Sequence, residues 1–148
     1  MTTDISMEHL KADAVDIFHK GFACSESVIY AIRKNFDLDL SDDAIAMSSG
    51  FPWGLGGGGC ICGALAGGAM CIGYFFGRRT PGDPSIQTCF ALTKELHDFF
   101  CESYTSPCCR IQIRGYEKDA PERKAKCTDI VSGTVEKTAE IILRELRK

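Results

Sequence analysis

The sequence predicts an all-helical fold, a single domain over residues 1–148 that packs five or six helices around a buried, glycine-rich central helix. Two observations predict the fold class: apolar residues recur at helical spacing through most of the chain, and no series of alternating segments is present to build a sheet. A third observation, 148 residues with 45% hydrophobic content, fits one compact core and leaves no room for a second domain.

The N-terminal third is expected to form two amphipathic helices and a short third one. Between Ile5 and Gly21 the apolar residues follow a helical period, and Gly21 is a typical stop signal. The segment "FACSESVIYAIRKNF" restarts the period and places Cys24 in the first turn of its helix. A short helix is expected after Ser41, which is a suitable N-cap.

The central segment from Phe51 to Gly77 has no charged residue and includes "GGGGCICGALAGGAMC" at 56–71. A stretch of this length is formally a membrane-span candidate. Its glycines argue against a span, because each lowers helix propensity by about 1 kcal/mol relative to alanine. We therefore expect a loop through Gly58 and Gly59, then a buried helix to about Phe76, and no membrane span.

The C-terminal half is expected to hold two long helices. The segment "TPGDPSIQ" predicts a helix entry at Pro84, with Asp83 as cap. The segment "SYTSPCCRIQIRGYEKDAPE" is expected to be a loop, although "RIQIR" within it alternates as a short strand would. A last helix is expected from Pro121 to about Leu146.

Charge and cysteine content narrow the class of function. The formal net charge of -3 and the absence of a basic stripe argue against a nucleic-acid partner. The N-terminal residues lack the pattern of a secretory signal, so a cytoplasmic location is expected. Nine cysteines in a reducing compartment indicate free thiols, metal ligands or redox chemistry rather than a disulfide scaffold.

Position in the predicted helices divides the cysteines into two groups. Cys71, Cys89 and Cys101 fall within apolar rows, where a free cysteine is usually a small buried hydrophobe. Cys24 is different, because the first turn of a helix favours thiolate over thiol and so predicts a lowered pKa. Cys60 and Cys62, where the glycine loop becomes the central helix, share that advantage.

Bare backbone surrounds the cysteines of the glycine loop. Around Cys60, the residues Gly58, Gly59 and Gly63 leave room for a thiol, a metal or a cluster to approach sulfur, so these four residues are candidate cofactor-binding positions. Further along, Cys108 and Cys109 precede two arginines whose charge favours thiolate, and Cys127 lies on the apolar stripe of the last helix.

Cys24, "CGALAG" at 62–67, "CCR" at 108–110 and Cys127 together resemble the C_GCAxxG_C_C family of redox-active proteins, and the resemblance covers nearly the whole chain. It implies a helical, redox-active protein. Carried over by position, its signature cysteines would be Cys24, Cys62, Cys109 and Cys127. Cys60 and Cys108 are extra thiols beside two of these positions, and either could replace or assist its neighbour.

Three functions are consistent with these cysteines. The first is thiol–disulfide exchange or electron transfer with an unidentified redox partner, which would make the protein an oxidoreductase. Since no C-x-x-C is present, the reacting thiols must come from distant segments. The second is a zinc or iron–sulfur site held by the same four signature cysteines, with Cys60 or Cys108 as substitutes. The third is a helical scaffold with inert thiols that binds a partner protein or forms a homodimer through a stripe of Gly59, Gly63 and Gly67.

Overall fold

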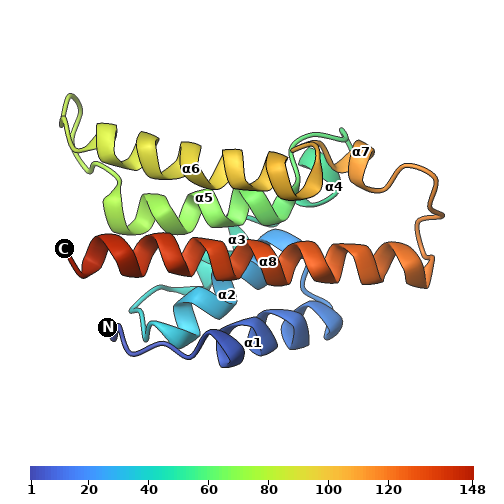
Figure 1. Cartoon of the computed structure of the whole chain (residues 1–148), viewed down its shortest axis with the longest axis horizontal. Helices are drawn as coiled ribbons and strands as arrows, with labels where there is room; N and C mark the ends of the chain where they lie inside the picture. The colour runs from blue at the N-terminus through green and yellow to red at the C-terminus, as the bar shows by residue number, and fades with distance from the viewer.

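The computed structural model describes all 148 residues and contains eight helical segments and no strand. Five of these segments are long and three are short (Figure 1). The all-helical prediction is confirmed. The segments are α1 (Met7–His19), α2 (Cys24–Asn35), α3 (Asp42–Ala46), α4 (Pro52–Leu55), α5 (Gly63–Phe76), α6 (Ile86–Tyr104), α7 (Cys109–Gln112) and α8 (Pro121–Leu146).

The long helices form a layered bundle in which α5, α6 and α8 run alongside one another (Figure 1). Helix α5 contacts α2, α6 and α8, and α1 packs against α2 and α8. The first six residues of α5 are all buried, from Gly63 to Gly68. Because five of these six residues are glycine or alanine, neighbouring helices can approach the axis of α5 closely, as expected for a central helix.

Glycines of α5 are the points of closest approach. A Cβ built on Gly67 would lie 2.7 Å from the backbone oxygen of Ser25 in α2. A Cβ on the next residue, Gly68, would lie 2.7 Å from both Leu96 Cδ2 of α6 and Thr138 Oγ1 of α8. One turn of α5 therefore packs against three helices at once.

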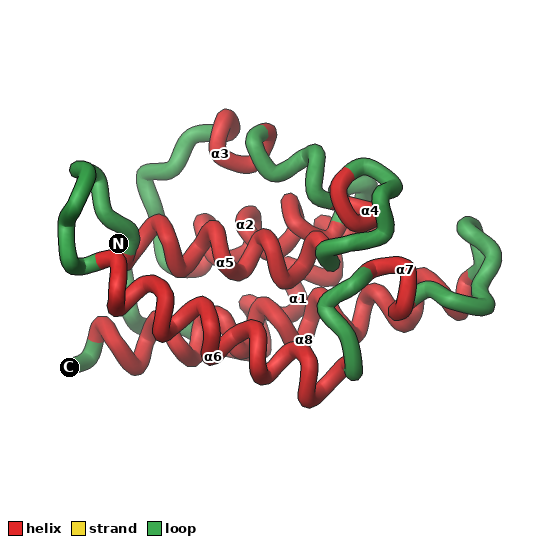
Figure 2. The backbone as a smooth tube through the Cα atoms, turned by 90° about the horizontal axis from the view of Figure 1, so that it is seen from above, coloured by secondary structure: helices red, strands yellow, loops and turns green.

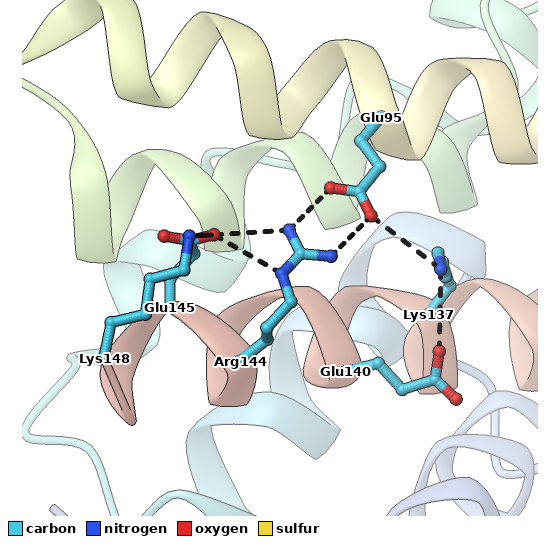
Figure 3. Close-up of polar contacts among 6 residues, drawn as sticks. All are labelled: Glu95, Lys137, Glu140, Arg144, Glu145 and Lys148. Atoms are coloured by element: carbon cyan, nitrogen blue, oxygen red, sulfur yellow. Dashed lines mark hydrogen bonds and ion pairs between the residues drawn. The ribbon is translucent and has the colours of Figure 1, made fainter.

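An ion-pair network joins α6 to α8 on the surface of the bundle (Figure 3). Arg144 of α8 binds the Glu95 carboxylate of α6 with two hydrogen bonds, of 2.7 and 2.6 Å. Lys137 lies 3.9 Å from the same carboxylate and 3.7 Å from Glu140. Both members of the central pair are partly exposed, so the network contributes less to stability than the apolar core does.

Three local features differ from the sequence predictions. The segment "RIQIR" belongs to α7 and the turn after it rather than to a loop or short strand, because Cys108 caps a single helical turn and five alternating residues without a partner strand form no sheet. Helix α6 begins at Ile86, two residues after Pro84, since Asp83 Oδ1 accepts a bond from Ser85 N in the preceding turn. Gly59 precedes α5 and lies outside it.

The predicted glycine stripe is therefore divided. Gly63 and Gly67 face α2 within the same chain, and Gly59 has a left-handed φ of 89° in the loop. The stripe is not free for a second copy of the chain. None of the helices combines the length and the hydropathy that a membrane span requires.

Candidate functional site

Three of the cysteines line one pocket of about 200 Å³, although they are distant in sequence. Cys24 is the first residue of α2, Cys109 the first of α7, and Cys127 lies in the second turn of α8. The fourth predicted cysteine, Cys62, is buried at the N-cap of α5. It is close enough to Cys24 and Cys109 for their charges to affect its ionisation. The bundle thus brings all four predicted cysteines to one end.

Backbone hydrogen bonds hold the loops that carry two of these cysteines. The N–H of Cys62 donates to the carbonyl oxygen of Pro107 at 2.6 Å, and the N–H of Arg110 donates to the carbonyl oxygen of Gly59 at 2.9 Å. These bonds tie the loop before α5 to α7 and to the loop before it, and Figure 2 shows α4 and α7 at this same end of the bundle. The position of Cys109 is therefore fixed relative to α5.

The first glycine of "CGALAG" makes room for a cysteine. A Cβ on Gly63 would collide with Cys24 Sγ, and it would also lie 3.4 Å from Ser25 N. The absence of a side chain at Gly63 lets the Cys24 sulfur lie directly against the backbone of α5. The second glycine, Gly67, accommodates the backbone of α2 one turn further along. Both glycines therefore position the helix that begins with Cys24.

Burial controls the ionisation of the two inner thiols. It raises the pKa of Cys24 to about 11 and that of Cys62 to about 12. Hydrogen bonds from the backbone at the helix starts act in the opposite direction, and the neighbouring cysteines add to the increase. The sequence-based expectation of lowered pKa values is wrong for both, because loss of hydration outweighs the favourable helix end.

The outer thiols have an arginine beside them. Burial raises the pKa of Cys109, the neighbouring Cys127 raises it further, and Arg123 opposes both effects. Arg123 Nη1 donates a hydrogen bond to Cys127 Sγ at 3.7 Å. The same guanidinium stacks over the ring of Trp53 at 4.6 Å, so the arginine is held in place from two sides.

The family model described as "Putative redox-active protein (C_GCAxxG_C_C)" matches residues 22–141. The chain belongs to the C_GCAxxG_C_C family. It is also 26% identical over 138 residues to a protein of Archaeoglobus fulgidus described as uncharacterized, covering 88% of this chain and 91% of that protein. No solved structure matches the chain.

In this C_GCAxxG_C_C protein the extra thiols form a separate pair. Neither Cys60 nor Cys108 lines the pocket. They are neighbours of each other, and a hydrogen bond with Cys108 raises the pKa of the Cys60 thiol, so the lowered pKa expected for Cys60 is wrong as well. Among the other predicted cofactor-binding positions, Gly58 and Gly59 lie in the loop outside the pocket, and only Gly63 contacts one of its cysteines.

The remaining cysteines lie away from the pocket. Cys71 and Cys89 are buried in the core, as expected for small apolar residues. Cys101 is half-buried, and its sulfur lies 3.6 Å from His97 Nε2 on the same helix.

The cysteine pocket contains no preformed group of metal ligands. No three side chains among the histidines, cysteines, aspartates and glutamates are placed so that they could hold one metal ion together.

Sequence reasoning missed two residues that line the pocket, Arg123 and Lys124. A signal for the first was available, because Arg123 and Cys127 are four apart on the predicted last helix and therefore share a face. Lys124 lies over the Phe18 ring, with Nζ 3.7 Å from the ring centroid, and no local pattern relates it to that distant residue.

Proposed function

We propose that the protein performs thiol–disulfide exchange at the pocket lined by Cys24, Cys109 and Cys127. The observation that carries this proposal is the convergence of these thiols from three distant segments on one accessible pocket. Membership of a family described as redox-active supports it. The substrate would be a disulfide, on a small molecule or on a partner protein, that reaches the pocket from solvent.

We assign the attack to Cys127, since it is the pocket cysteine that accepts a hydrogen bond from an arginine. Its thiolate attacks a substrate disulfide RSSR, which forms a mixed disulfide and releases RS⁻. The thiolate of Cys109 then attacks the Cys127 sulfur of that mixed disulfide and releases the second RS⁻. In total, two protein thiols are oxidised to one disulfide, RSSR is reduced to two RSH, and the two thiol protons pass to the leaving groups.

Cys24 and Cys62 have a different role in this scheme. With pKa values of about 11 and 12, both are neutral thiols near pH 7 and react slowly as nucleophiles. Their positions beside the reacting pair make them second acceptors, to which the disulfide can pass by further exchange. We expect such a transfer to be slower than the first oxidation.

Thiol counting under mild oxidation tests the proposal. Reduced protein is equilibrated with glutathione redox buffers, quenched with an alkylating reagent, and its free thiols are counted by mass. We expect a reversible loss of two thiols in the wild type, its abolition in Cys127→Ser, and its retention in the matched control Cys89→Ser, which changes a buried core thiol. Loss of no thiols at any ratio, or an unaltered loss in Cys127→Ser, would contradict the proposal.

A further inference from the structure

The pocket that holds the three thiols carries positive charge that no acidic side chain balances. Its lining includes Arg123 and Lys124 and contains no aspartate or glutamate. Neither residue takes part in any of the ion pairs of the structure. Two neighbouring cations in a partly dehydrated site are unfavourable unless an anion joins them.

Arg123 is fixed in position with donor capacity to spare. Its guanidinium is stacked on Trp53 and bonded to Cys127 Sγ, yet its Nε is buried and has no hydrogen-bond partner. A buried donor without an acceptor is unfavourable, and a ligand oxygen bonded to it would remove that penalty. The guanidinium group is well suited to bind carboxylate oxygens.

Lys124 is the second cation of the pocket lining and lies against Phe18. Its Nζ is 3.4 Å from the backbone oxygen of Phe18 and 3.7 Å from the centre of that ring. Burial lowers the pKa of Lys124, and the charge of Arg123 lowers it further. Cys24 and Cys109 do not supply the missing negative charge near pH 7, since burial raises the pKa values of both thiols.

We infer that the pocket selects small disulfides that carry a carboxylate, and this inference rests on the exchange reaction proposed above. Arg123 and Lys124 bind the carboxylate, and the substrate disulfide then lies beside Cys127. Phe22 and Trp53 cover the apolar part of the ligand. A pocket of about 200 Å³ suits a small molecule rather than a folded partner. The reaction itself is the balanced exchange described above, with RSSR now an anionic disulfide.

Oxidation rates with two matched reagents test the inference. Reduced protein at pH 7 is treated with 3,3′-dithiodipropionate, which carries two carboxylates, or with bis(2-hydroxyethyl) disulfide, which is neutral. The ratio of the two rates is divided by the same ratio for urea-unfolded protein, so that the intrinsic reactivities of the reagents cancel. We expect the folded protein to prefer the anionic reagent by about tenfold, equivalent to about 1.4 kcal/mol.

Charge variants assign this preference to the pocket. Arg123→Gln with Lys124→Gln should remove it, and Arg123→Lys should retain most of it. Lys126→Gln is the matched control, because it removes one positive charge from the same helix at a residue that does not line the pocket. Equal ratios for folded and unfolded protein, or an equal loss in the Lys126→Gln variant, would overturn the inference.

Binding measured without oxidation separates the two proposals. Trp53 is the only tryptophan of the chain, so its fluorescence reports on this pocket alone. We expect 3-mercaptopropionate to change the fluorescence saturably and 2-mercaptoethanol to have no such effect. If this binding occurs and depends on Arg123 while neither disulfide oxidises the protein, the inference stands and the exchange function fails. If oxidation proceeds equally with both reagents and no binding is seen, only the inference fails.

Discussion

Replacing Gly67 by alanine tests the close packing of α2 on α5 that places Cys24. The added Cβ would lie 2.7 Å from Ser25 O and 3.1 Å from Ser25 Cα, so a backbone segment rather than a flexible side chain must move. Overpacking of this kind costs about 1–3 kcal/mol. Alanine in a helix interior recovers about 1 kcal/mol relative to glycine. We expect Gly67→Ala to lower the free energy of unfolding by up to about 2 kcal/mol.

Gly73→Ala provides the matched control on the same helix. A Cβ at Gly73 meets no atom within 4 Å, so only the gain in helix propensity applies, about 1 kcal/mol of stabilisation. The difference between the two variants isolates the contact with Ser25 and should be about 1–3 kcal/mol. Urea unfolding followed by circular dichroism in a reducing buffer measures both. Equal stabilisation of the two variants would refute the close approach of α2 to α5.

The remaining predictions concern ionisation and the surface. Because the pKa of Cys24 is about 11, the rate of its alkylation by iodoacetamide in the folded protein should rise about tenfold per pH unit from pH 8 to 10. A rate that levels off below pH 9 would argue against burial of this thiol. Folding raises the pKa values of Cys24 and Cys62 above 9.0, so their contribution to stability is complete below pH 9 and is lost toward pH 11–12. The free energy of unfolding, measured in urea, should therefore be lower at pH 10 than at pH 8. Equal values at the two pH values would contradict the raised pKa values. Glu95→Gln should cost less than about 1 kcal/mol at pH 7, because its partner Arg144 is half-exposed. The hydrogen bonds from Arg144 lower the pKa of Glu95, so the difference from wild type should shrink as pH falls below 4.5 and through that lowered pKa. A difference that does not change with pH would contradict the role of the ion pair.

Helices were predictable where apolar periodicity and end signals agreed. The last helix was expected from Pro121 to about Leu146 and spans those residues, and the central helix ends at Phe76 as expected. The loop or short strand expected at "RIQIR" is a helical turn instead, because alternation over so few residues does not distinguish a strand from one helical turn. Periodicity decides long elements and is uninformative for short ones.

The candidate site was less accessible to sequence reasoning. Convergence of four cysteines could be expected only through the family resemblance, since no local spacing joins Cys24 to Cys127. The ionisation of Cys24 was predicted in the wrong direction, because its place at a helix start is visible in the sequence and its burial is not. The unpaired charge of Lys124 depends on which acids fold near it, and tertiary packing alone determines that.

Disulfide mapping tests most directly whether the converging cysteines are a redox centre. Folded, reduced protein is partly oxidised in a glutathione buffer, trapped by alkylation and digested, and the linked peptides are identified by mass spectrometry. We predict that Cys109 joined to Cys127 is the first intramolecular bond to accumulate. If the first bond instead involves Cys71 or Cys89 of the core, or if no bond forms among Cys24, Cys62, Cys109 and Cys127, the pocket is not the redox centre.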